Sequence, residues 1–470
     1  MPGKGFRTPG LESFVDNLDE FKLERSTEVL IQLLARRQIS GSKNCAIAVA
    51  GLLLRIVQDS PANSVQDLLD QVSQIGQRLI AAQPRELAVG NIVRRVLGLI
   101  REVSGIGQDD EIRSELSSML DGQDGLNRPE MLHSISTYSP LRHAASEFTG
   151  ASTPESPQPI KRPNFAQSGY SSFAMPSTKT AMNLFGLLAE PSYSPTGTPP
   201  ITNRESPALS TKNLNIIQEQ ASIKETIQEI GDGMRELLDE VDLAAEQISE
   251  SATDYINSND MIMAQGLSDT THKFLAEAAR KRKFTVFVVE GEPNEGQATR
   301  NMILYGSAKS PSDDDGQEGT TKRLVDLGVN VVLIPDSAIF AIMSTVTKVL
   351  LAPQAVLANG GLVANVGTSM IAAAAQAHKV PVLALSGVYK LSPLYPLDTD
   401  ELREIGSASG LGGSVGSWGK VNVMNPMWDY VEPEKVNLYI TNLGGHAPSY
   451  LYRIVADHYD KEDINLGTDM

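Results

Sequence analysis

Residues 329–351 read VNVVLIPDSAIFAIMSTVTKVLL, and this stretch decides the expected fold. Its two ends, 329–334 and 348–351, are short apolar runs bounded by polar residues, which is typical of buried strands. Between them, residues 337–346 have the length and composition of a helix. A strand, a helix and a second strand in this order form the unit from which parallel sheets are built.

The same alternation continues on both sides of this stretch. Residues 284–289 (FTVFVV) and 380–385 (VPVLAL) are further apolar strands, and helical stretches are expected at 271–281 and 369–378. Near-continuous apolar strands separated by helices indicate a parallel sheet that is covered on both faces.

We therefore expect a Rossmann-like, doubly wound α/β domain over residues 261–470. An acidic and polar insertion interrupts it at 306–319.

The first part of the chain has the periodicity of helices. Apolar residues recur at about 3.6-residue spacing in the segments 18–38, 64–82 and 87–103. The segment 45–57 is apolar almost all round, which predicts a buried helix. The short connections between these segments predict an antiparallel helical bundle. The fold class is therefore expected to be α + α/β, with the bundle preceding the parallel-sheet domain.

A segment rich in Ser, Thr and Pro, about 140–212, separates these helices from a further periodic run at 213–249. Such a composition buries too little apolar surface to offset its ordering entropy, so we expect disorder there. Because the helical pattern resumes afterwards, we expect an insertion within one helical domain over 12–260.

Composition limits the classes of function. The chain has 470 residues, 41% of them hydrophobic and 21% charged, which predicts at least two soluble domains. With 40 basic and 57 acidic residues its net charge is −17, which disfavours direct nucleic-acid binding. The lone Cys45 excludes an intramolecular disulfide, and no signal peptide or long apolar run is found. We expect a cytoplasmic protein that does not bind a membrane.

Parallel sheets bind ligands beyond the carboxyl ends of their strands, and one glycine-rich stretch is expected there. It contains Asn359, Gly360, Gly361, Gly367 and Thr368, and it precedes a helix whose N-terminal amides suit an anion. A tight turn with Thr368 or Ser369 as the helix N-cap explains the same residues, and neither GxGxxG nor the P-loop is matched. Both interpretations stay open. The six histidines show no zinc-ligand spacing, so we expect no metal and no cofactor.

Several motifs together resemble a known family. They are GNIVRRVLGLIRE at 90–102, HKFLAEAARKRKFTVFVVE at 272–290, LANGGLVANVGT at 357–368, YKLSPLYP at 389–396 and NLGGHAPSYLYRIVADHY at 442–459. In this order they are similar to the regulatory alpha, beta and delta subunits of eukaryotic translation initiation factor 2B. The resemblance covers both expected domains but neither insertion.

The resemblance implies a non-catalytic regulatory and scaffold subunit. The family's complex exchanges GDP for GTP on translation initiation factor 2, and the exchange activity resides in a different subunit. The implied partners are the alpha, gamma, delta and epsilon subunits, a second copy of this chain, and initiation factor 2 itself. The regulatory subunits sense phosphorylation of the alpha subunit of initiation factor 2.

Sugar-phosphate isomerases of the methylthioribose-1-phosphate type share the family's fold and are the main alternative. They need a cysteine after the first strand, where this chain has Ala264 and Gln265, and an aspartate where it has Gln354. Glu292 replaces an arginine and would repel a phosphate. We therefore expect no isomerase activity. A third alternative is an allosteric metabolite-binding protein, which copurification with sister subunits would distinguish.

Helix 90–102 is the expected substrate-facing element. Arg94 and Arg101 are seven residues apart and share one face, and Arg95 and Glu102 share an adjacent one. The buried side is expected to consist of Val93, Val96, Leu97 and Ile100. A solvated face with weak ion pairs is ordinarily the better explanation of such charges. The resemblance implies that the helical domain docks the alpha subunit of initiation factor 2, so we expect Arg95 and Glu102 first, then Arg94 and Arg101, to contact it.

The end of the chain is rich in aromatic residues and methionine, which are enriched in interface cores. We expect the C-terminal domain to build the main subunit interface from this group. For each residue, the alternative is that it packs in the core of the domain's own sheet. The group consists of Met424, Met427, Trp428, Tyr430, Tyr450, Leu451 and Tyr452.

Overall fold

The structure is a computed structural model that describes residues 10–18, 20–59, 64–105, 211–294, 296–308, 322–396, 404–407, 411 and 423–466. Side chains are described from residue 223 onward in the helix that begins at Thr211. The described residues belong to one compact unit, 1–118 with 209–470. The insertion expected at about 140–212 lies outside them up to residue 210, and so does the insertion at 306–319 from residue 309 onward.

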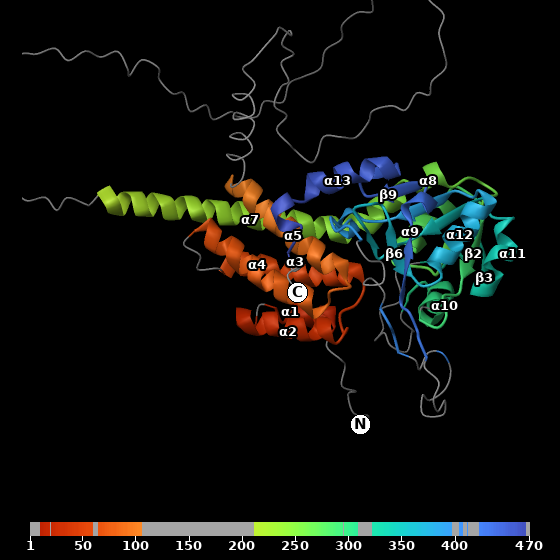
Figure 1. The fold of residues 1–470 in the computed structure, drawn as a ribbon, viewed down its shortest axis with the longest axis horizontal. Helices are drawn as coiled ribbons and strands as arrows, with labels where there is room; N and C mark the ends of the chain where they lie inside the picture. Colours follow the sequence, from red (N-terminus) through yellow and green to blue (C-terminus); the bar gives the residue numbers. More distant parts are fainter. Residues whose placement is uncertain are drawn as a thin grey trace, which may run out of the picture. The chain divides into compact units, whose positions relative to one another are not determined.

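Most of the N-terminal helices form where the apolar periodicity predicts them, and these surround one apolar core. Figure 1 shows them side by side with the long helix α7. In chain order the helices of this region are α1 (Leu11–Asp16), α2 (Leu23–Ala35), α3 (Ser42–Asp59), α4 (Val65–Ala82), α5 (Leu87–Ser104), α7 (Thr211–Glu250) and α8 (Ala252–Tyr255). The short helices α1 and α8 were not predicted, and α8 packs in the core of the sheet region. The prediction of a helical N-terminal region is confirmed.

Local signals fix the ends of these helices. The Ser64 side chain accepts a hydrogen bond from the Asp67 amide at 3.1 Å and so caps α4. Gly105 ends α5 in the left-handed conformation, φ 69°, which glycine adopts without strain. The expected buried side of α5 is confirmed, because each of its residues is at most 1% exposed: Val93, Val96, Leu97 and Ile100.

The α/β region is built on a seven-stranded sheet with the order β10-β9-β7-β4-β1-β2-β3. Its strands are β1 (Met261–Gln265), β2 (Thr285–Val289), β3 (Asn330–Ile334), β4 (Lys348–Leu351), β7 (Val382–Leu385), β9 (Leu438–Thr441) and β10 (Gly444–His446). Neighbouring strands are parallel except that β10 pairs antiparallel with β9. After β1, the chain adds β2 and β3 on one side and then β4, β7 and β9 on the other. Folds of this kind bind ligands at such a switch point, here between β1 and β4.

Helices cover both faces of this sheet, so the doubly wound prediction is confirmed. One face packs on α9 (Asp269–Ala279) and α10 (Gly296–Tyr305), through residues such as Phe274 and Met302. The other packs on α11 (Ile339–Met343), α12 (Thr368–His378) and α13 (Leu451–His458). The helix expected at 337–346 is shorter than predicted, since it begins with the single 3₁₀ turn Asp336–Ala338 and ends at Met343.

A second, three-stranded antiparallel sheet was not expected from the sequence. It consists of β5 (Ala355–Val356), β6 (Leu362–Asn365) and β8 (Trp428–Val431), in the order β5-β6-β8. Strands of two and four residues give too little alternation to be recognised, and β8 reaches β6 from more than sixty residues further along the chain.

Helix α7 contributes to two cores. Ile230, Met234 and Val241 are buried in the core of the N-terminal helices. About two turns later, Ile248 belongs to the core between the seven-stranded sheet, α9 and α10. The domain boundary expected at 260–261 stays a prediction.

Glycines in α4 and α5 provide a matched test of helix packing. A Cβ added at Gly76 would collide with Cγ1 of Val93 on α5, whereas one added at Gly98 meets nothing within 4 Å. We expect Gly76→Ala to lower the free energy of unfolding by about 1–2 kcal/mol through overpacking. Gly98→Ala should raise it by about 0.5–1 kcal/mol, since alanine favours the helix. Chemical denaturation of both variants checks this, and equal effects would show that α4 and α5 do not pack as described.

Candidate functional site

The arginines of α5 contact the C-terminal segment of the chain, defined here as residues 460–466. Arg94 is only 3% exposed, and its guanidinium donates hydrogen bonds to the carbonyls of Asp463 (3.1 Å), Ile464 (3.2 Å) and Leu466 (3.4 Å). A buried guanidinium needs such partners, and three carbonyls of one segment supply them. Arg94 therefore anchors the C-terminal segment and is not available as a surface contact.

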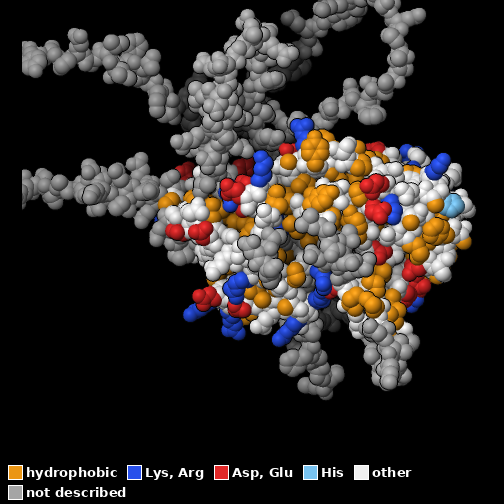
Figure 2. All heavy atoms as spheres, in the orientation of Figure 1, with side chains coloured by type: hydrophobic (Ala, Val, Ile, Leu, Met, Phe, Trp, Pro, Cys, Tyr) orange, Lys and Arg blue, Asp and Glu red, His pale blue; other side chains and the backbone are white. Residues whose placement is uncertain are grey.

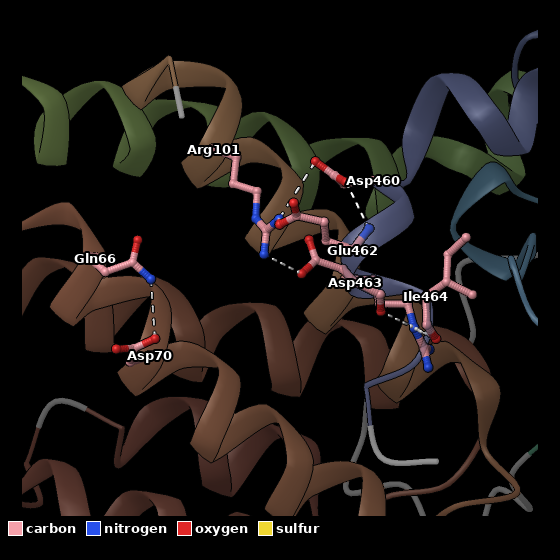
Figure 3. Close-up of polar contacts among 8 residues, drawn as sticks. Gln66, Asp70, Arg101, Asp460, Glu462, Asp463 and Ile464 are labelled. Atoms are coloured by element: carbon pink, nitrogen blue, oxygen red, sulfur yellow. Dashed lines mark hydrogen bonds and ion pairs between the residues drawn. The ribbon is translucent and has the colours of Figure 1, made fainter. Parts of the chain in front are cut away.

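Arg101 binds the same segment, as its seven-residue spacing from Arg94 predicts. Its guanidinium forms an ion pair with Glu462, lies 3.0 Å from Asp463 Oδ1 and lies 3.9 Å from Asp460 Oδ2 (Figure 3). Burial raises the pKa of Asp463 to about 6; Arg101 and Arg94 oppose the shift, and the carboxylates of Asp460 and Glu462 add to it. The negative charge of Asp463 is thus incompletely compensated.

Arg95 faces another element, helix α7. Its guanidinium donates to both carboxylate oxygens of Glu240, at 3.1 and 2.7 Å, and the two side chains are 13% and 23% exposed. Burial alone would raise the pKa of Glu240, but the charge and hydrogen bonds of Arg95 outweigh it and lower that pKa. A bidentate pair of this kind is strong and directional, so it fixes α5 against α7.

Glu102 is the one exposed residue among the four predicted on α5. The structure therefore brings Arg94, Arg95 and Arg101 into contacts within the chain and leaves Glu102 facing solvent. Their role toward initiation factor 2 stays a prediction.

The predicted anion site does not form one pocket. Asn359, Gly360 and Gly361 form the hairpin turn before β6, whereas Gly367 and Thr368 follow its other end. The four residues of β6, which span about 13 Å, and Val366 lie between the two groups.

The hairpin turn is held by side chains of both sheets, Tyr430 on β8 and Tyr439 on β9. The Asn359 amide donates to the Tyr430 hydroxyl at 2.7 Å, and its oxygen accepts from the Gly361 amide at 2.8 Å. Gly360 has φ +84°, and its carbonyl accepts a hydrogen bond from the Tyr439 hydroxyl. The turn is therefore a structural connection between β5 and β6.

The N-terminus of α12 already holds a carboxylate. Asp429 on β8 accepts hydrogen bonds from the amides of Gly367 (2.7 Å) and Ser369 (3.2 Å), while the Thr368 hydroxyl donates to the Asn365 carbonyl at 2.6 Å. The helix dipole and the free amides stabilise this anion as they would a phosphate. The N-cap residue is Gly367, so neither Thr368 nor Ser369 is the cap that the turn interpretation proposed. Asp429 has no recognisable signal in the sequence, because the pairing of β6 with β8 brings it to this helix.

The positions that matter to an isomerase are occupied by contacts within the chain. Gln354 donates to Glu86 Oε2 at 3.2 Å, and Gln265 donates to the Val366 carbonyl at 2.9 Å. Glu292 pairs with Arg300 at 2.9 Å.

Two buried titratable residues lie near Gln354. Glu86 and Lys390 are 5% and 9% exposed, and Lys390 Nζ donates to the Pro353 carbonyl at 3.1 Å. Burial raises the pKa of Glu86 and lowers that of Lys390 to about 8. Neither residue had a signal in the sequence, since Glu86 lies at the start of α5 and Lys390 more than three hundred residues later.

Other site chemistry is limited in the part of the chain that the structure describes. It contains no group of three or more His, Cys, Asp or Glu side chains placed to hold a metal. No described helix is long and apolar enough to cross a membrane. Cys45 is buried, and burial raises the pKa of its thiol, as expected for an inert cysteine.

The aromatic group near the C-terminus divides into core and surface. Leu451 is 1% exposed and belongs to the sheet's own core, whereas Met424, Tyr450 and Tyr452 are 66%, 43% and 70% exposed. Tyr450 stacks on His446 with ring centroids 5.6 Å apart. Figure 2 shows hydrophobic side chains gathered on the surface over the region that α13 occupies in Figure 1.

Comparisons with known proteins agree with this architecture. The model of the initiation factor 2 subunit family matches residues 38–155, 199–306 and 310–448. The chain is 32% identical over 442 residues to translation initiation factor eIF2B subunit beta of Schizosaccharomyces pombe, covering 93% of this chain and 96% of the relative. The Dictyostelium discoideum subunit beta is also 32% identical, over 447 residues, with the same shares covered.

Two crystal structures of Chaetomium thermophilum proteins are similar in fold, each at 26% sequence identity. One is eIF2B beta, with a TM-score of 0.58, covering 97% of this chain and 98% of that one. The other is a tetrameric eIF2B-beta2-delta2 complex, whose matched chain has a TM-score of 0.57, with 96% and 100% covered.

Asp463 should make stability depend on pH. Its pKa in the folded state, about 6, lies above the ordinary 3.8, so the folded chain binds more protons between these values. Stability should therefore fall as pH rises from about 4 to 6 and stay lower above. Asp463→Asn removes this term and should raise the free energy of unfolding at pH 7.5 by about 1–2 kcal/mol.

Denaturation at pH 5 and 7.5 measures this effect. The control is Glu462→Gln, whose side chain is 74% exposed, and it should change stability by less than about 0.5 kcal/mol. A loss of stability in Asp463→Asn at pH 7.5 would show instead that its pair with Arg101 outweighs burial.

Proposed function

The chain belongs to the initiation factor 2 subunit family, and we propose that it is a non-catalytic regulatory and scaffold subunit of the guanine-nucleotide exchange complex that acts on translation initiation factor 2. The observation that carries this proposal is the match to subunit beta relatives along 93% of the chain. The site geometry supports the absence of catalysis. Gln354 and Glu86 bond to each other where an isomerase would need a free aspartate.

The proposed partners are the alpha, gamma, delta and epsilon subunits and a second copy of this chain. The Chaetomium thermophilum complex with two beta and two delta subunits supports the delta-type partner and the pairing of copies. On this chain, the exposed aromatic residues Tyr450 and Tyr452 suit the centre of such an interface, because tyrosine is enriched in interface hot spots. The subunit contact is proposed to include α13 and the loop before it.

The finer proposal concerns recognition of initiation factor 2. Helix α5 is proposed to contact the alpha subunit of initiation factor 2 and to help distinguish its phosphorylated form. Glu102 is exposed and supports a direct role. Arg95 is proposed to act with Glu240, since the pair leaves 13% of the arginine side chain exposed at the surface between α5 and α7.

Substitution of Tyr452 tests the subunit proposal. The tagged full-length chain should copurify from native extract with sister subunits that mass spectrometry identifies. Because Tyr452 is 70% exposed, Tyr452→Asp should leave the fold intact but weaken binding to the delta-type subunit by about thirtyfold, as loss of a hot spot does.

The matched control is Leu304→Asp, an equally drastic change at a 55% exposed residue of α10. It should leave binding unchanged. If the wild-type chain brought down no sister subunit, the scaffold proposal would be wrong. If Tyr452→Asp bound the delta-type subunit as tightly as wild type does, the interface would lie elsewhere.

A charge reversal tests the recognition proposal. Glu102→Lys in the intact complex should weaken binding of initiation factor 2 by about tenfold and change the ratio between its phosphorylated and unphosphorylated forms, since an exposed charge at a contact acts through the partner's charges. Glu24→Lys makes the same charge change at an exposed position of α2 and should have no effect. Unchanged affinity for both forms in Glu102→Lys, with the complex intact, would restrict α5 to a structural role.

A further inference from the structure

A cavity of about 280 Å³ lies between α4, α5 and the C-terminal segment. Its lining includes Gln66 and Asp70 on α4, Arg101 on α5, and Glu462 and Asp463 on the C-terminal segment. Figure 3 shows these side chains around the space that separates α4 from the C-terminal segment. Pockets for drug-sized ligands are larger, about 300–1,000 Å³, so this one suits a group the size of a single side chain.

The lining carries a surplus of negative charge. Three carboxylates, those of Asp70, Glu462 and Asp463, face one guanidinium, that of Arg101. Arg101 is already engaged by Glu462 and Asp463. An anion entering the cavity would meet uncompensated carboxylates, whereas a cation would be attracted by them.

Asp463 has a buried carboxylate oxygen that a cation would compensate. The residue is 3% exposed, and its Oδ2 has no hydrogen-bond partner within the described part of the chain. Only Oδ1 contacts Arg101. In Figure 3 the carboxylate points away from its own backbone, toward Arg101 and the space facing α4. A buried carboxylate that is half paired is costly, and a nearby positive charge would offset that cost.

We propose that this cavity binds an organic cation, an alkylammonium or guanidinium group. The exposed carboxylates of Asp70 and Glu462 contact the cation, and the buried charge of Asp463 strengthens the field that draws it in. The described residues offer no group of three or more ligands placed for a metal ion. The cation comes either from a lysine or arginine side chain of a partner protein or from a free polyamine.

Calorimetric titration of the full-length chain tests this proposal. The probes are N-acetyl-lysine amide and the uncharged N-acetyl-norleucine amide, which has nearly the same shape. The lysine derivative should bind at least about tenfold more tightly, and Asp70→Asn and Asp463→Asn should each weaken its binding by about tenfold. Asp70 accepts only a 3.4 Å hydrogen bond from Gln66, so Asp70→Asn keeps the fold even if Asp463→Asn changes the C-terminal segment.

Asp16→Asn is the control for general attraction to an acidic chain, since it removes one exposed charge from α1. Equal binding of the two derivatives, or an equal loss in Asp16→Asn and Asp70→Asn, would overturn the proposal. The source is distinguished by two further measurements. Weaker association of Asp70→Asn with copurified sister subunits identifies a partner side chain. Unchanged association, with spermidine binding more tightly than the lysine derivative, identifies a polyamine.

Discussion

One continuous helix, α7, is the constraint on which the rest of the described structure depends. Its residues Ile230, Met234 and Val241 complete the core of the N-terminal helices, and Ile248 enters the core on one face of the seven-stranded sheet. Because an α-helix is stiff and advances 1.5 Å per residue, a shift of one residue in its packing would move side chains out of both cores at once. The bidentate pair of Arg95 with Glu240 then sets the position of α5 on this helix.

The second connection runs through the end of the chain. Arg94 and Arg101 hold the C-terminal segment, so residues that follow the sheet return to the helices that precede it. Periodicity placed Arg94 and Arg101 on one face correctly. It could not identify the residues that pack against that face, because those residues lie about 360 positions later in the sequence. The spacing of charges within one helix does not show which distant segment contacts it. The same surface that suggested substrate contacts is therefore largely occupied by the chain itself.

The parallel sheet was predictable because each buried strand is apolar along its whole length and is separated from the next by a helix. The small sheet was not, since β5 has two residues and β8 pairs with β6 only after a long intervening segment. Without that sheet, the sequence does not show that the glycine-rich stretch divides between the two ends of β6. Gly360 permits a hairpin turn at one end of β6, whereas Gly367 precedes a helix whose amides receive Asp429. A single sequence shows a glycine's conformational freedom but not the side chain that approaches it.

These internal contacts bear on where function can reside. At the carboxyl ends of the strands, Gln265, Gln354 and Glu292 each bind another group of the chain, and Asp429 takes the place that an anionic ligand would occupy at α12. Hydrogen bonds and ion pairs made within the fold stabilise one arrangement of these side chains and resist rearrangement around a substrate. Catalysis requires the opposite, groups left free to exchange protons with a bound molecule. These contacts support the proposed non-catalytic role, in which recognition would fall to exposed side chains such as Glu102 and Tyr452.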